Sequence, residues 1–208
     1  KYGGQVISTT IDKYIYITLR QLPPFFEHKH RIVYAKTEKV NNINKIQHPS
    51  VREILRYYKV KTGLEIHYDG DLPARSGLGS SSAFTVGLIN SISSNLKMRK
   101  SKKQIASEAI YIEQKMIKEI VGSQDQVATS YGGLNRIMFT KNNFKVKKVN
   151  VSKLKLDLFE KNLLLIFTGV TRQAPKVAHS YVKKIDLIDK KLNLINDCVN
   201  SFIKTLTN

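Results

Sequence analysis

Apolar residues alternate in several parts of the chain, and this pattern is typical of strands. Stretches that alternate in part, are rich in β-branched and aromatic side chains, or are apolar throughout cover residues 5–19, 31–35, 64–68, 134–139, 144–151 and 163–167. The fourth and fifth flank Asn142-Asn143 and predict a hairpin around that pair. Leu163-Leu-Leu-Ile-Phe167 is apolar throughout, so we expect a buried strand that ends at Thr168-Gly169.

Apolar residues at helical spacing follow or precede most of these stretches. They predict helices over residues 48–58, 84–92, 101–116, 174–184 and 187–206. Ser50 and Ser101 stand at positions where their hydroxyls are expected to cap the first and third helix. Gly87 weakens the second helix unless another backbone packs closely there. A change of domain is expected between about residues 150 and 162.

The stretch Asp71-Leu-Pro-Ala-Arg-Ser-Gly-Leu-Gly-Ser-Ser-Ser-Ala83 carries the strongest chemical signal. It joins a predicted strand to a predicted helix. Glycine-rich turns that run into a helix bind anions, because unpaired N–H groups and the helix dipole both face the ligand. A serine-capped helix after a glycine turn is the simpler alternative, but the order of proline, glycines and serines is more specific than that.

Two carboxylates are candidates for chemistry. Glu113 lies on the flank of the apolar face of its helix, where an unpartnered charge is unfavourable. Asp125 lies in the polar cluster Gly122-Ser-Gln-Asp-Gln126, which leads into another helix with Ser123 as its cap. In isolation, Glu113 would be interpreted as a boundary residue that reaches solvent. Asp125 would be interpreted as a first-turn acid that the helix dipole favours.

The net charge of +19, from 35 Lys and Arg against 16 Asp and Glu, raises the possibility of nucleic-acid binding. The basic residues are scattered, however, and the densest clusters, 99–103 and 145–148, are not interleaved with aromatic residues. A solvated basic surface is therefore the preferred interpretation, and a nucleic-acid partner is not expected. No apolar run reaches the roughly 20 residues of a membrane span. A single cysteine, Cys198, and an opening without a signal-peptide pattern favour the cytoplasm.

Residues 73–83 resemble the phosphate-binding motif of the GHMP kinases. Residues 3–14, 71–90, 121–127 and 167–172 resemble most closely the branch that phosphorylates D-glycero-D-manno-heptose 7-phosphate on its anomeric hydroxyl. The resemblance implies an α+β fold. Residues 1–155 would form an N-terminal ATP-binding domain of the ribosomal-protein-like βαβ type, and residues 156–208 would begin a ferredoxin-like C-terminal domain. The family's first motif would precede Lys1 and its third would follow Asn208, so the chain is expected to be an internal piece of a longer protein that is inactive alone.

The resemblance also implies site residues, with ATP and Mg²⁺ as the cofactors. The residues that would hold the ATP phosphates are Pro73, Gly77, Leu78, Gly79, Ser80, Ser81 and Ser82. Ser81 and Glu113 would bind Mg²⁺, and Asp125 would be the catalytic base. Thr168, Gly169 and Arg172 would contact the sugar or its phosphate. Fucose, galactose and other sugars remain alternative substrates, an RNA-binding module remains the non-enzyme alternative, and the oligomeric state stays open.

Overall fold

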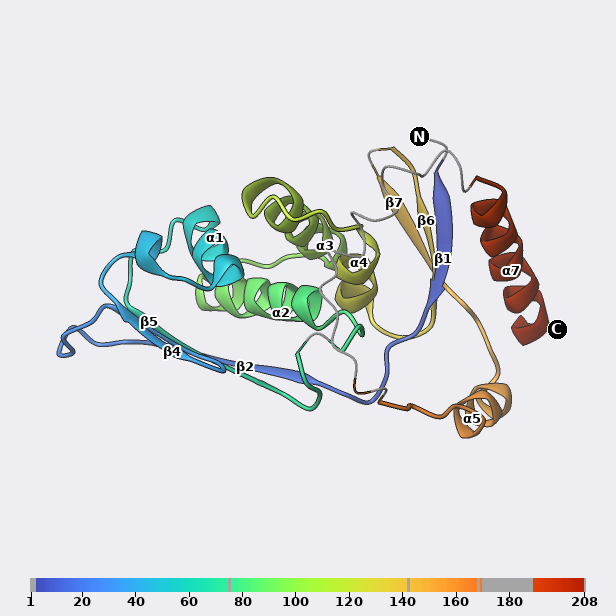
Figure 1. The fold of residues 1–208 in the computed structure, drawn as a ribbon, viewed down its shortest axis with the longest axis horizontal. Helices are drawn as coiled ribbons and strands as arrows, with labels where there is room; N and C mark the ends of the chain where they lie inside the picture. The colour runs from blue at the N-terminus through green and yellow to red at the C-terminus, as the bar shows by residue number, and fades with distance from the viewer. Residues whose placement is uncertain (1–2, 75, 142, 168, 170–188, 208) are drawn as a thin grey trace.

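The computed structural model describes residues 3–74, 76–141, 143–167, 169 and 189–207, which form two β-sheets with helices packed against them (Figure 1). The strands are β1 Gly4–Ser8, β2 Ile15–Gln21, β3 His30–Val33, β4 Thr37–Val40, β5 Leu64–Gly70, β6 Asn135–Phe139 and β7 Phe144–Lys148. The α-helices are α1 Pro49–Tyr57, α2 Ser80–Asn95, α3 Lys102–Tyr111, α4 Gln124–Tyr131, α5 Lys153–Lys161 and α7 Asp189–Thr207. A 3-10 turn, η1 Ile43–Lys45, precedes α1, and a π-helical turn, η2 Ile112–Met116, continues α3.

The larger sheet has the strand order β2-β5-β3-β4. Its outer pairs are antiparallel and its central pair, β3 with β5, is parallel. A parallel pair requires a crossover connection, and here the crossover contains β4 and α1. Helices α1 and α2 cover one face of this sheet (Figure 1). The result is a βαβ arrangement in which β5 leads directly into the glycine-rich stretch and then into α2.

The main core lies between this sheet and the helices. Leu64 and Ile66 of β5 are fully buried, and so are Leu88, Ile89 and Ile92 of α2. The apolar residues of β5 and those at helical spacing along α2 therefore face the same core, as the sequence predicts. A Cβ on Gly87 would meet the Cδ1 atom of Ile17 at 3.0 Å, so a side chain, not another backbone, packs closely there.

The smaller sheet, β1-β6-β7, is antiparallel throughout. Ala106, Val127 and Ile137 form a second small core that joins it to α3 and α4. On its other side, α7 lies next to β1 (Figure 1). Gln5 of β1 and Arg136 of β6 both bond the side chain of Asn200 in α7.

Several sequence expectations are confirmed and others need correction. The α+β class and the hairpin of β6 and β7 are confirmed. Ser101 caps α3 through a capping box with Gln104. Ser50, by contrast, lies inside the first turn of α1 and His48 is the cap residue, because Pro49 suits the first helical position, where its missing N–H is not needed. Strand β4 was not expected, since its sequence, Thr-Glu-Lys-Val, is mostly polar.

The expected buried strand over Leu163–Phe167 is wrong. These residues belong to no strand or helix, and each of the five is between 55% and 82% exposed. An apolar run alone is therefore not enough to predict a buried strand, since no described strand or helix covers these residues. The expected helix 174–184 lies outside the described residues, as does the beginning of the expected helix 187–206. The division at residue 155 stays a prediction.

No described helix combines the length and apolar character that crossing a bilayer would require.

Candidate active site

The glycine-rich stretch forms the N-terminal approach to α2. Gly77 and Gly79 have φ angles of +83° and +75°, a left-handed region that side chains disfavour. Gly79 is the cap residue of α2, and among the described residues no side chain bonds the first N–H groups of this 16-residue helix. Those donors have no intrahelical partner, so the loop presents an uncapped, electropositive helix end.

Asp71 fixes the start of this loop against β2. The backbone N–H of Tyr14 donates to Asp71 Oδ2 at 2.8 Å, and the N–H of Asp71 donates to the carbonyl of Tyr14 at 3.0 Å. The loop is therefore tied to the sheet on one side and to α2 on the other. Pro73 and Leu78 lie on it and are exposed.

Asp125 lies directly against this loop. A Cβ built on Gly79 would meet Asp125 Cγ at 3.4 Å and Oδ2 at 3.5 Å, so the carboxylate occupies the space beside the bare glycine. Asp125 lies in the first turn of α4. The chain thus brings together two motifs that are more than forty residues apart in sequence.

Glu113 contacts the same helix end through a serine of its first turn. It lies in the π-helical turn η2 and is only 2% exposed. Ser82 Oγ donates to Glu113 Oε2 at 3.1 Å, and Gln126 Nε2 donates to the same oxygen. π-Helical turns inside α-helices are frequent at functional sites, because the extra residue re-aims the side chains that follow it.

Burial perturbs the carboxylates around this helix end. Desolvation raises the pKa of Glu113; the nearby polar groups of Gln126, Thr85 and Ser82 offset part of this effect, and the charge of Asp125 adds to it. The pKa of Asp125 is also raised by desolvation, since protein atoms flank its carboxyl although the residue keeps an exposed side. Desolvation and the charge of Glu113 raise the pKa of Glu119. Perturbed carboxylates that converge on a loop are typical of functional sites.

The donor set around Glu113 fits a hard divalent cation. Glu113 Oε1 is buried and has no hydrogen-bond partner among the described residues, and the same holds for Thr85 Oγ1 and Gln126 Oε1. Buried unpartnered oxygens need a water or an ion. Oxygen ligands with one carboxylate are the set that Mg²⁺ prefers. Among the described residues there is no group of three or more His, Cys, Asp or Glu side chains that could hold a metal, so the fit is to an ion that keeps further ligands of its own.

The structure brings most of the predicted site residues together. Ser80 is partly buried and Ser81 is exposed at the first turn of α2, while Ser82 is the serine that bonds Glu113. Gly169 has a φ of +73° and is exposed. Thr168 and Arg172 lie outside the described residues.

Gln126 and Thr85 were not among the predicted site residues. Gln126 is 1% exposed and Thr85 is fully buried. A signal for Thr85 existed, because it is the one polar side chain within the otherwise apolar stretch of residues 83–89. For Gln126 the signal was weaker, since it stands in a run of polar residues and only the fold shows that its side chain turns inward.

Comparison with known proteins identifies the same region. Residues 44–133 match the family model described as the GHMP kinases N terminal domain. A D-glycero-alpha-D-manno-heptose 7-phosphate kinase from Campylobacter jejuni is 28% identical over an alignment of 208 positions, which covers 92% of this chain and 59% of that protein. The chain thus spans about three fifths of the curated relative that it matches.

Solved structures show the same fold. A D-glycero-D-manno-heptose 1-phosphate kinase from Bacteroides thetaiotaomicron superposes with a TM-score of 0.65 at 22% identity, covering 74% of this chain and 54% of that one. The mevalonate kinase of Methanococcus jannaschii superposes with a TM-score of 0.64 at 19% identity, covering 96% and 66%. At these identities the likeness concerns the fold alone.

Proposed function

We propose that this chain is the nucleotide-binding part of a small-molecule kinase that transfers the γ-phosphoryl group of ATP to a sugar hydroxyl, because residues 44–133 match the GHMP kinases N terminal domain. The observation that carries the proposal is the convergence of Gly79, Asp125 and Glu113 at the uncapped end of α2. An anion-binding helix end with two carboxylates beside it suits phosphoryl transfer, which depends mainly on positioning and on compensating negative charge.

In this proposal the loop holds the nucleotide through its backbone. The free N–H groups at Gly79 to Ser82 would bind the β- and γ-phosphates of ATP, and the two left-handed glycines would let the phosphates approach the chain closely. Pro73 and Leu78, exposed on the approach, would flank the nucleotide.

Asp125 would act on the acceptor. The acceptor hydroxyl oxygen forms a bond to the γ-phosphorus, the bond between that phosphorus and the β,γ-bridging oxygen breaks, and Asp125 takes the hydroxyl proton. Its raised pKa makes it a better proton acceptor than an ordinary aspartate. Its contact with Gly79 supports the role, because the base must lie next to the group that is transferred.

Glu113 and Ser81 are the proposed ligands of Mg²⁺. Glu113 would use Oε1, which has no partner among the described residues, while Ser82 and Gln126 hold its other oxygen. When bound, Mg²⁺ would neutralise charge on the phosphates of ATP. Ser81, exposed next to Ser82 in the first helical turn, would take the solvent side of the ion.

The acceptor that we propose is D-glycero-D-manno-heptose 7-phosphate, phosphorylated on its anomeric hydroxyl. The support is the heptose 7-phosphate kinase of Campylobacter jejuni, which matches 92% of the chain. Thr168, Gly169 and Arg172 are the proposed contacts of the sugar and its phosphate, because an arginine fork suits a phosphate group. We further propose that residues 1–155 form the ATP-binding domain, that residues 156–208 begin a C-terminal domain, and that the protein works in the cytoplasm.

A phosphoryl-transfer assay of the full-length protein tests the proposal. ATP and Mg²⁺ are supplied with heptose 7-phosphate, free heptose, fucose or galactose, and the product is identified by the position of its new phosphate. Transfer to the anomeric hydroxyl of the 7-phosphate alone supports the proposed acceptor. Transfer to free fucose or galactose keeps the kinase but replaces the substrate, and ATP binding without transfer to any sugar contradicts the sugar-kinase proposal.

A further inference from the structure

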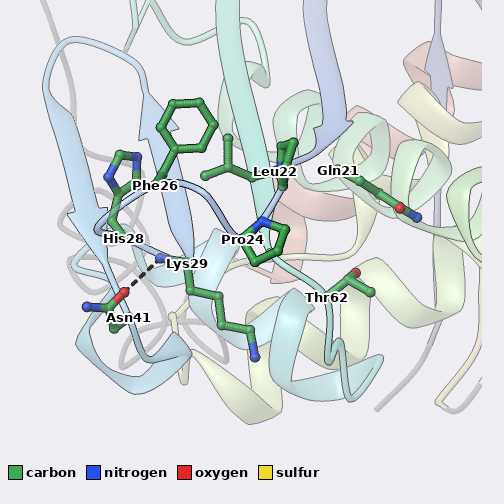
Figure 2. Close-up of a pocket in the computed structure, with 10 residues that line it drawn as sticks. Gln21, Leu22, Pro24, Phe26, His28, Lys29, Asn41 and Thr62 are labelled. Atoms are coloured by element: carbon green, nitrogen blue, oxygen red, sulfur yellow. Dashed lines mark hydrogen bonds between the residues drawn. The ribbon is translucent and has the colours of Figure 1, made fainter.

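A cavity of about 610 Å³ lies at the far end of the larger sheet, away from the proposed active site. It is lined by the loop that follows β2, by Asn41, and by Thr62 and Gly63 just before β5 (Figure 2). Strand β5 separates it from the glycine-rich loop. Its 7 residues span about 20 Å at the usual rise per residue, so a ligand in this cavity would not touch the proposed site.

The walls of the cavity are held in place before any ligand arrives. The N–H of Lys29 donates to Asn41 Oδ1 at 2.8 Å, and Asn41 Nδ2 donates to the carbonyl of Glu27 at 3.1 Å. At the base, the N–H of Leu22 donates to the carbonyl of Gly63 at 2.9 Å. A preformed pocket of this volume falls in the range of small-molecule sites.

The lining combines flat apolar surfaces with unused polar groups. Phe26 is 47% exposed and forms a tilted ring pair with His28, with centroids 5.7 Å apart. Figure 2 shows Leu22 and Pro24 near Phe26, and the Lys29 side chain extending toward the side of Thr62. The Nε2 atom of His28 is shielded from solvent and has no hydrogen-bond partner among the described residues.

These surfaces are complementary to one class of ligand. Aromatic and proline faces bind flat apolar groups, and an exposed lysine beside them binds an anion. The chain's net charge of +19 favours anionic ligands over cationic ones. We propose that this cavity is a second ligand site, which binds a small planar aromatic molecule carrying one anionic group. The ring packs on Phe26 and the prolines, and the anion meets Lys29.

The fluorescent probe 8-anilinonaphthalene-1-sulfonate has this chemistry and tests the site in the full-length protein. Titrations are run with a saturating non-hydrolysable ATP analogue, so that binding at the glycine-rich loop is blocked. Phe26→Ala and Lys29→Gln should each weaken probe affinity by about tenfold, equivalent to about 1.4 kcal/mol. The neutral analogue N-phenyl-1-naphthylamine should lose affinity with Phe26→Ala but not with Lys29→Gln.

Neighbouring residues outside the cavity supply the controls. Phe25 is 89% exposed and does not line the cavity, and Lys61 is an exposed lysine next to Thr62. Phe25→Ala and Lys61→Gln should bind the probe as the unaltered protein does. All four variants should have the melting temperature of the unaltered protein. Equal losses of probe affinity in Phe25→Ala and Phe26→Ala would mean that the probe binds an exposed apolar loop, which would overturn the proposal. Unchanged affinity in every variant would overturn it as well. The result is independent of whether the protein proves to be a kinase.

Discussion

Glu113 combines two properties that are seldom found in one carboxylate: it is almost fully buried, and one of its oxygens has no partner among the described residues. Asp125, twelve residues later in the chain, is exposed on one side and lies against Gly79. The two acids therefore have different surroundings. This difference is the basis for assigning Glu113 to the ion and Asp125 to the acceptor.

The roles separate in a magnesium titration. Glu113→Gln weakens ion binding, so excess Mg²⁺ should restore part of the lost rate. Asp125→Asn removes the base and leaves the ion site intact, so added Mg²⁺ should restore none of a loss of roughly 10²–10⁴-fold. The rates of both variants are measured in the full-length protein. Rescue of Asp125→Asn alone would show that the roles are reversed, and full activity of both variants would move the site elsewhere.

The raised pKa of Glu113 predicts a pH-dependent stability. The folded protein holds the Glu113 proton at pH values where the unfolded chain has lost it, so this group contributes most at low pH. Its contribution is lost as pH rises from the ordinary glutamate range through the raised value. The free energy of unfolding by urea, measured without metal, should therefore fall less with rising pH in Glu113→Gln than in the unaltered protein. Parallel pH curves for the two proteins would contradict the assignment of a raised pKa.

Gln126 holds the buried carboxylate in place. Gln126→Leu removes a donor to Glu113 and should lower the free energy of unfolding at neutral pH by about 1.5–3 kcal/mol. Gln124→Leu, two residues earlier and exposed, is the matched control and should change stability little. In a Glu113→Gln background the effect of Gln126→Leu should shrink, since the charge is gone. An undiminished effect in that background would mean that Gln126 acts through packing instead.

At the scale of elements, helices α3 and α2 differ in how the N–H groups of their first turns are bonded. Ser101 accepts from the N–H of Gln104 at 3.3 Å, and the Gln104 side chain accepts from the N–H of Ser101 at 2.8 Å. The start of α2 is different, because no side chain in the described part of the chain caps it. One helix is closed by its own side chains, and the other is left open where the proposed phosphates would bind.

Removing the capping hydroxyl should destabilise the protein without affecting the site. Ser101→Ala should lower the free energy of unfolding by about 1 kcal/mol, the usual effect of losing an N-terminal cap. Ser101→Asp, which keeps a capping acceptor, should retain most of the stability. Chemical denaturation measures both variants. Equal stability of Ser101→Ala and the unaltered protein would show that the capping box contributes nothing.

The elements differ in how well the sequence predicts them. Helix α2 and strand β5 were predictable, because the apolar residues of each follow the period of that element and face the same core. Leu163–Phe167 was not, since an apolar run becomes a buried strand only where a neighbour covers it. Within the site, the glycines and both acids were visible as motifs. The bonds of Ser82 and Gln126 to Glu113 depend on tertiary packing, which no local pattern encodes.

For the whole molecule, the charge of +19 is the property most open to misinterpretation. Some of the basic side chains contact acidic side chains in the structure. Glu65 contacts Arg20, Arg31 and His67 on the sheet, and Glu53 contacts Arg52 and Arg56 on α1. The two densest basic clusters lie on separate elements, residues 99–103 at the start of α3 and residues 145–148 in β7.

Generic RNA should therefore bind only weakly. At physiological salt we expect dissociation constants no tighter than the non-specific range of about 10⁻⁴–10⁻⁶ M, with a steep loss of affinity as salt rises. Fluorescence anisotropy with labelled RNAs of different sequence measures this. A nanomolar complex with one sequence, persisting at physiological salt, would favour an RNA-binding function.

The π-helical turn that carries Glu113 has a consequence for how the chain tolerates change. Such a turn is an α-helix with one residue inserted, so the direction of the residues after it depends on a count as well as on a sequence. Deleting the exposed Lys115 would keep both acids, yet it would restore ordinary winding and rotate everything downstream by about 100°, one residue's share of a 3.6-residue turn. The backbone bond from the N–H of Glu119 to the carbonyl of Glu113 would then be lost. The geometry of the site is thus sensitive to the phase of a helix, and insertions or deletions here should be far more damaging than substitutions.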